Sequence, residues 1–270
     1  MYKLVEQLIK GKSQNEDECE DAVVITEHII AVIDGVTSKK EKKYDGITAG
    51  KMAALVISET LKTYQDIYKK DADNLFRLIN QELKNKAERV GAGENELKAS
   101  IVLYNDYYKE VWGYGDCQCI VNGIHYDHHK KVDTLMGELR AFYINELISA
   151  GVSEEELLAK DRGREQILDL LVKQSEFENV ANSEFGYPEL NGGEIVDKFI
   201  VRYKVPEGTE VVLASDGYPE LLSSLEESER KLQNVISQDP LLYKDYKSTK
   251  GVYHGNDSYD DRTYVRFVVE

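Results

Sequence analysis

The sequence predicts an α+β fold, a four-layer α/β/β/α sandwich of two antiparallel sheets flanked by helices. Two observations favour it. Apolar runs come in pairs separated by short turns, which is typical of antiparallel strands, and helical periodicity is confined to blocks between those pairs. Because no linker, repeat or low-complexity tract interrupts residues 1–270, the pattern also favours a single domain.

The first pair of strands ends on an acid. Residues 22–33 contain two apolar runs around a short polar turn, and the second run stops on Asp34 and Gly35. In a hairpin register Asp34 lies opposite Glu20 or Asp21, so three carboxylates converge. Like charges at that separation repel unless a cation or protons intervene. The sequence therefore predicts a metal site or a raised pKa at this strand end.

Helical periodicity marks four further stretches. Apolar residues recur every three or four positions over 49–64, and a second helix is expected from Asp73, as its cap, to about Ala87. Residues 131–177 are expected to form helices that pack on a sheet and include a surface insertion. A last helix is expected after a cap at Ser224.

The remaining strands are predicted in two groups and a closing run. Strand patterns cover 99–105 and 110–121, and again 198–205 and 209–214, where a Pro-Glu-Gly turn predicts a second hairpin. A final strand is expected over 262–269. Successive pairs of this kind are what an antiparallel sandwich requires.

Acids recur at the ends of these later strands. Asp116 lies inside an apolar run, Asp216 and Gly217 close another, and Asp260 and Asp261 precede the last. A charged residue in a core-like strand indicates either a bend that exposes it or a bound partner. These acids can share one site only if the fold brings their strand ends together, which spacing alone does not show.

Composition narrows the classes of function. With 41% hydrophobic and 31% charged residues the chain resembles a soluble globular protein, and a net charge of −16 argues against nucleic acid or an anionic membrane as partner. No apolar run is long enough to span a bilayer, the start lacks a signal peptide's layout, and three cysteines form no disulfide framework. We expect a cytoplasmic protein.

The ordered motifs resemble a known family. Glu-Asp, Asp-Gly, Gly-Asp, Ser-Asp-Gly and Asp-Asp-x-Thr follow one another across nearly the whole chain, and together they resemble the type 2C metal-dependent protein phosphatases. The resemblance implies hydrolysis of phosphoserine or phosphothreonine on proteins, two Mn²⁺ or Mg²⁺ ions with a third as an option, and a flap, here around residues 150–185.

The resemblance also implies roles for individual residues. Asp34 would bridge the two ions and Gly35 would offer its carbonyl, while Asp216 and Asp260 would bind the second ion. Asp116, with Asp216, would hold the third. Asp34 and Asp216 are accordingly the expected catalytic pair.

Two frames compete at the N-terminal motif. Lys12 followed by Glu16-Asp17 matches the family's Arg-x-x-Asn-Glu-Asp pattern with Lys for Arg, whereas Glu20-Asp21 has the better hairpin distance. We favour Glu20 as the metal-side acid and Lys12 as the phosphate-binding residue. A lysine would bind phosphate as a point charge and not as a fork.

Departures from the family keep other functions open. The loop after Gly35 lacks the family's glycines and is basic over residues 39–43, and Gly115-Asp-Cys-Gln lacks an arginine. The alternatives are a catalytically inactive scaffold that binds a partner, and a phosphatase of a small phosphorylated molecule. The histidines at 125, 128 and 129 are candidate proton donors to a leaving group.

Overall fold

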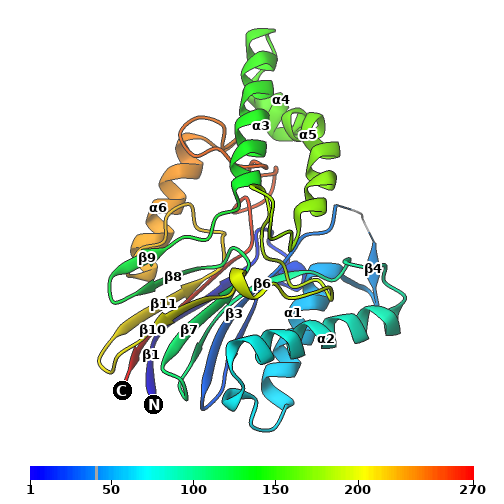
Figure 1. The fold of residues 1–270 in the computed structure, drawn as a ribbon. Coiled ribbons are helices and arrows are strands. Elements are labelled where there is room, and N and C mark those ends of the chain that lie inside the picture. Colours follow the sequence, from blue (N-terminus) through cyan, green and yellow to red (C-terminus); the bar gives the residue numbers. More distant parts are fainter. Residues whose placement is uncertain (40–41) are drawn as a thin grey trace.

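A computed structural model describes residues 1–39 and 42–270. Figure 1 shows two stacked sheets with helices outside them and a group of helices projecting beyond one end of the sheets. The strands are β1 (Tyr2–Lys10), β2 (Ala22–Ile25), β3 (Ile29–Gly35), β4 (Lys43–Tyr44), β5 (Ile47–Thr48), β6 (Ala99–Asn105), β7 (Glu110–Tyr114), β8 (Gln118–Val121), β9 (Ile124–Tyr126), β10 (Val201–Lys204), β11 (Glu210–Ala214) and β12 (Arg262–Val269). The α-helices are α1 (Ala49–Thr63), α2 (Ala72–Val90), α3 (Lys131–Ser149), α4 (Glu154–Ala159), α5 (Arg162–Lys173) and α6 (Leu225–Gln238).

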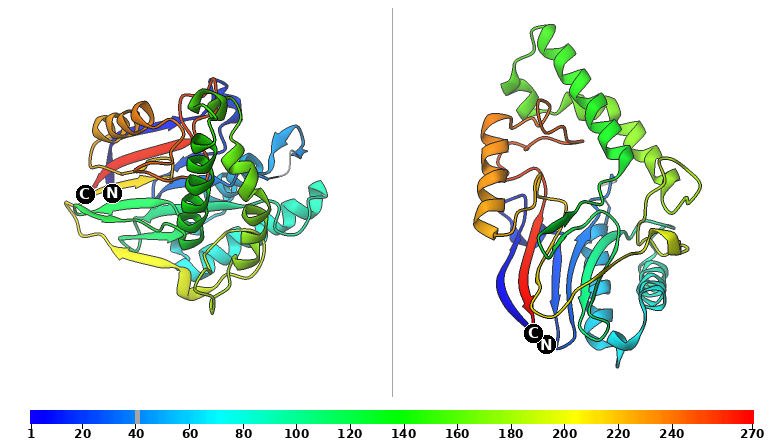
Figure 2. Two further views of the ribbon diagram at one scale, coloured as in Figure 1. Left: turned by 90° about the horizontal axis from the view of Figure 1, so that it is seen from above. Right: turned by 60° about the vertical axis from the view of Figure 1, so that its left-hand side comes forward.

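The two large sheets confirm the predicted class. Sheet A has the order β1-β12-β11-β8-β9 and sheet B the order β10-β7-β6-β3-β2, and every neighbouring pair within them is antiparallel. A small third sheet pairs β4 with β5. The first and last strands of the chain, β1 and β12, lie side by side in sheet A, as the two views of Figure 2 also show.

Three apolar layers hold the sandwich together. Between the sheets, alternate residues of each strand interdigitate, such as Val32 and Val102 of sheet B with Leu213 and Phe267 of sheet A. The outer face of sheet B packs against α1 and α2, and the outer face of sheet A packs against α6. The central strands of both sheets are therefore buried on both faces.

The first hairpin has the predicted register. Ala22 pairs with Ile33 and Ile25 with Ile30, and the Thr26 amide donates to the Ile29 carbonyl across the turn. Continuing the ladder by one position puts residue 21 opposite Asp34. The hydrophobic pattern fixed this register because a slip by one residue would move the whole apolar set to the other face.

Two strand predictions were wrong in the same way. The run 110–121 is two strands, because the chain leaves sheet B after Tyr114 and enters sheet A at Gln118. The expected hairpin over 198–214 is not one either, since β10 pairs with β7 in sheet B and β11 with β8 and β12 in sheet A. Apolar patterning is the same for strands in either sheet, so it cannot report which sheet a strand joins.

The helices agree with the periodicity except at their ends. The cap of α2 is Asp71, whose carboxylate accepts the Asn74 amide, and not Asp73. Helices α3, α4 and α5, with the 3₁₀ turn after α5, form a helical unit over residues 131–177, and α4 begins with the predicted capping box at Ser153. Among the described residues, no helix combines the length and the apolar character that a membrane crossing needs.

Candidate metal centre

Three carboxylates from distant parts of the chain meet at one end of the sandwich. Asp34 is the second-last residue of β3, Asp116 lies where the chain crosses between the sheets, and Asp216 lies shortly after β11. One oxygen from each lies within 4.8 Å of the other two, so the predicted convergence of these three acids holds. They line a pocket of about 440 Å³ whose far wall is formed by the helical unit.

Glycines allow the backbones to approach closely at this end. A Cβ on Gly35 would lie 2.3 Å from the Gly50 carbonyl oxygen, so the start of α1 sits directly on the end of β3. Gly115 has φ +118°, and a Cβ there would lie 2.2 Å from the Ser100 hydroxyl. Without these two glycines the strand ends could not bring Asp34 and Asp116 together.

The charged forms of Asp34 and Asp216 are disfavoured by their surroundings. Burial raises the pKa of both carboxyls, and the neighbouring acids raise it further, to about 8 for Asp216 and well above its usual value for Asp34. The contributing neighbours include Asp116 and Asp260. A divalent cation between these oxygens would remove the repulsion, since oxygen-only ligand sets suit hard ions such as Mg²⁺ and Mn²⁺.

Asp116 is compensated by a buried lysine. Burial opposes its charge, but the Lys130 ammonium lies 2.8 Å from its Oδ2 and the Ser100 hydroxyl donates to its Oδ1 at 2.5 Å, so its pKa is lowered. Lys130 also pairs with Glu189 at 3.2 Å. Burial raises the pKa of Glu189 to about 7, and its second oxygen has no hydrogen-bond partner among the described residues.

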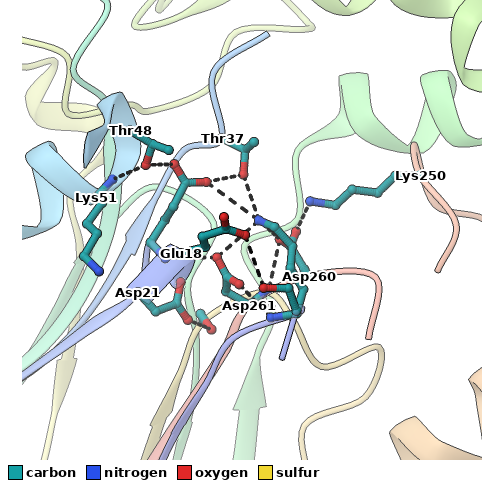
Figure 3. A network of polar contacts seen from close by, with 12 residues as sticks. Glu18, Asp21, Thr37, Thr48, Lys51, Lys250, Asp260 and Asp261 are labelled. Carbon is teal, nitrogen blue, oxygen red and sulfur yellow. Dashed lines mark hydrogen bonds and ion pairs between the residues drawn. The ribbon is translucent and has the colours of Figure 1, made fainter. Parts of the chain in front are cut away.

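Asp260 lies close to the three acids but is held by two cations. The Lys12 ammonium lies 3.5 Å from its Oδ1, and the Lys250 ammonium pairs with its Oδ2 (Figure 3). Burial opposes the charge of Asp260, yet the two lysines lower its pKa to about 2. The next residue, Asp261, accepts the Lys12 amide at 2.8 Å and the Glu20 amide at 3.0 Å.

Glu20 stands beside this network and outside the group of three acids. Its two oxygens accept the hydroxyls of Thr48 at 2.6 Å and Thr37 at 2.5 Å, and the Lys12 ammonium lies 3.7 Å away. Glu20 is buried. These contacts fix Glu20 beside Lys12 and the loop at Thr37. Each carboxylate oxygen keeps a second lone pair, so the metal-side role of Glu20 stays a prediction.

The competing N-terminal acids have different surroundings. Glu16 and Asp17 lie in an exposed 3₁₀ turn. Asp21 instead accepts the hydroxyls of Ser215 and Thr263 at 2.7 and 2.8 Å, and burial together with Asp261 raises its pKa to about 7. The hairpin argument for the pair at 20–21 agrees with this burial.

The histidine candidates differ in their positions. The His128 ring is held between the Cys117 carbonyl and the Tyr203 hydroxyl, and His125 contacts Gln118, whereas His129 lines the pocket. Within the basic loop, residues 40 and 41 lie outside the described part of the chain. Lys39 lines the pocket.

Sequence reasoning missed the charged residues that form ion pairs around Asp116 and Asp260. Lys130, Glu189 and Lys250 all line the pocket, and all three come from irregular chain or from the residue that caps a helix. None sits at a strand end or in a periodic pattern, so no local signal marks them. An isolated lysine in a polar stretch is ordinarily a solvated surface residue.

The comparisons with known proteins concern structure only. No family model matches the chain, and no curated protein matches it. The structure of the Mycobacterium tuberculosis serine/threonine phosphatase PstP/Ppp is similar at 14% identity, with 99% of each chain covered and a TM-score of 0.50. The catalytic domain of serine threonine protein phosphatase PstP in complex with two manganese ions is similar at 14% identity, with complete coverage of both chains and a TM-score of 0.52. The chain thus has the fold of these serine/threonine phosphatases over its whole length.

Proposed function

We propose that the protein is a metal-dependent phosphatase that hydrolyses phosphoserine or phosphothreonine on proteins. The observation that carries the proposal is the meeting of Asp34, Asp116 and Asp216 in one pocket, because two of them have strongly raised pKa values that a cation would relieve. The PstP structure with two manganese ions has the same fold and supports this choice of metal.

Four acids and one carbonyl are the proposed ligands. Asp34, Asp116 and Asp216 would hold Mn²⁺ or Mg²⁺ first, with the Gly35 carbonyl beside Asp34 and Asp260 completing the set once its lysines turn away. When bound, such ions lower the pKa of a coordinated water and neutralise phosphoryl oxygens. We propose two ions and a third, weaker one; Glu20 would act on the centre through Thr37 and Thr48.

The chain's own groups then have defined tasks. In the net reaction one water adds to phosphorus, the bond from phosphorus to the serine or threonine oxygen breaks, and that oxygen leaves with a proton as the free alcohol. The buried strand ends hold the acids in fixed geometry, which is where positioning contributes most. Lys12 supplies positive charge beside Asp260. Its role in phosphate binding stays a prediction, and it would require Lys12 to leave the three carboxylates that surround it.

The state of the cysteines supports a proposal for the cellular compartment. Cys19, Cys117 and Cys119 are buried free thiols in the structure, which suits a reducing compartment, and we place the protein in the cytoplasm.

The test is hydrolysis of an aryl phosphate and of a phosphothreonine peptide, each with Mn²⁺ and with chelator. We expect Mn²⁺-dependent turnover that falls by about 10³-fold or more in Asp34→Asn, since one ligand and one charge are lost. Asp17→Asn, in the exposed turn, is the matched control and should keep native turnover. Mn²⁺ binding without turnover on either substrate would favour the inactive scaffold, and turnover of the aryl phosphate alone would favour a small phosphorylated molecule.

A further inference from the structure

A loop that touches the helical unit also forms one wall of the pocket. Residues 242–251, here called the 242–251 loop, follow α6 and contribute Tyr246 to Lys250 to the pocket lining. Its backbone is bonded to helices α3 and α5, far from the sheets in sequence. The loop therefore links the helical unit to the acids.

The link is centred on a fully buried arginine. Arg140 of α3 has no exposed surface and forms a fork with Asp161, with Nε 3.0 Å and Nη2 2.7 Å from Oδ2. Its remaining nitrogen, Nη1, donates to the carbonyls of Leu242 at 3.2 Å and Ser248 at 3.0 Å. One guanidinium thus fixes the loop at both ends, which a lysine could not do.

Further contacts hold the loop on either side of Lys250. The Gly251 amide donates to Asp161 at 3.3 Å, and Arg164 donates to the Thr249 carbonyl at 2.6 Å. A Cβ on Gly137 would lie 2.7 Å from the Lys247 carbonyl oxygen, so α3 and the loop are in direct backbone contact. These bonds fix the backbone position of Lys250.

Lys250 differs from Lys12 in its surroundings. Its ammonium pairs with Asp260, its side chain is 18% exposed, and it lines the pocket. Lys12 is surrounded by three carboxylates, of Glu20, Asp260 and Asp261, and does not line the pocket. An ammonium has three N–H donors, so Lys250 retains donors on the pocket side for an anion.

Neighbouring cations make this wall attractive to an anion. Lys39 lines the pocket with an exposed side chain, and its ammonium donates to the Thr37 carbonyl at 3.4 Å. The charges of Arg164 and Lys250 also act on that ammonium, so these three cations lie near one another. Neighbouring cations disfavour one another's charged forms, and a bound dianion such as phosphate relieves this repulsion.

We propose that Lys250 is a phosphate-binding residue of this pocket and that Arg140, through Asp161 and the 242–251 loop, positions it. The inference rests on the proposed function and deepens it, since it names a residue that recognises the phosphoryl dianion. Lys250 binds the phosphoryl group by turning from Asp260, which frees that carboxylate for a cation.

The first test measures affinity for inorganic phosphate by calorimetry on the Mg²⁺-loaded full chain. Lys250→Met should weaken phosphate binding by about 10-fold or more, the effect of one charge-assisted hydrogen bond, and Lys250→Arg should restore it. Lys244→Met is the matched control, because Lys244 lies in the same loop, pairs with Glu154 at 3.0 Å and does not line the pocket. Native affinity in Lys250→Met would overturn the proposal.

The second test addresses positioning. Arg140→Lys keeps the charge opposite Asp161 but loses the bonds to the loop, and Gly137→Ala pushes the Lys247 carbonyl without altering any charge. Both should weaken phosphate binding, and both should lower the melting temperature, because one loses buried hydrogen bonds and the other pushes backbone. Phosphate affinity is therefore compared at a temperature at which circular dichroism shows the variant folded. If Arg140→Lys does not fold, Gly137→Ala decides, and native phosphate affinity in a folded variant would overturn the role of the loop.

The phosphatase activity and the phosphate contact of Lys250 can be tested separately. Phosphate also should slow acetylation of Lys250 by acetic anhydride, read by mass spectrometry, and that measurement needs no turnover. A protein without phosphatase activity whose Lys250 is nonetheless protected would refute the proposed function and leave the anion contact standing. Active enzyme with an unprotected Lys250 would refute the inference alone.

Discussion

The candidate metal centre contains aspartates of two kinds. The pKa is raised for Asp34 and Asp216 and lowered for Asp260, although all three are carboxyl groups of one site. Burial and the other acids raise the pKa of Asp216 to about 8, whereas Lys12 and Lys250 lower that of Asp260 to about 2. The difference is made by two ammonium groups. The charge of Asp260 is already balanced by two lysines, whereas a cation bound at Asp34 and Asp216 would balance theirs.

The largest expected effect comes from supplying the missing cation. Mn²⁺ at 100 times its Kd should stabilise the protein by about 2.7 kcal/mol, a rise in melting temperature of roughly 5–10 °C. Thermal unfolding with Mn²⁺ and with EDTA measures it. The rise should disappear in Asp216→Asn, and a rise that survives there would place the cation elsewhere.

Next in size, neutralising one acid of each kind should change the stability of the metal-free protein with opposite signs. Asp34→Asn removes repulsion and should raise the free energy of unfolding by about 1 kcal/mol, whereas Asp260→Asn strands two lysines and should lower it by about 2 kcal/mol. Urea unfolding in EDTA gives both values.

The control for that pair is an exposed ion pair of the same type. Lys10 and Asp257 lie 3.5 Å apart with nearly half of each side chain exposed, so Asp257→Asn should change stability by no more than about 0.5 kcal/mol. If Asp34→Asn and Asp260→Asn changed the free energy of unfolding in the same direction, the proposed electrostatic difference between Asp34 and Asp260 would be wrong.

The last comparison concerns how the stability of the metal-free protein changes with pH. Asp21 and Asp216 have folded-state pKa values of about 7 and 8, above their unfolded values, so the folded protein holds more protons between about pH 4 and 8. Stability without metal should therefore fall as pH rises from 6 to 8, by up to about 1 kcal/mol per pH unit for each group. Urea unfolding at three pH values measures the slope, which Mn²⁺ should flatten.

Below about pH 4, protonation of Asp260 should determine how stability changes with pH. The pKa of Asp260 is lowered, so its contribution is fully present above about pH 4 and is lost as the pH falls toward 2. Asp260→Asn should reduce this acid limb of the curve and leave the slope between pH 6 and 8 in place.

Much of the fold followed from local pattern. The hairpin register at Asp34, the helix over 49–64 and the closing strand over 262–269 are set by apolar periods, which the sequence displays directly. The meeting of Asp34, Asp116 and Asp216 was expected from the family resemblance, because strand ends gather only once strand order is known.

The rest depended on contacts that sequence does not display. Lys130 and Lys250 reach the acids from the start of a helix and from an irregular loop, and their positions are fixed by Glu189 and Arg140 many residues away. The exchange of strands between sheets after Tyr114 was also hidden. Each is decided by tertiary packing, which no short window of residues encodes.

The pairing of β1 with β12 has a consequence for how the protein is made. Tyr2 pairs with Val269, so β1 cannot form this ladder of sheet A until β12 has been synthesised. Asp260 and Asp261 arrive just before that last strand. Contacts this distant in sequence slow folding, and a nascent chain would expose Leu4 and Ile9 on an unpaired edge throughout. Asp260 therefore joins the candidate metal centre only after the chain has been made up to the start of β12.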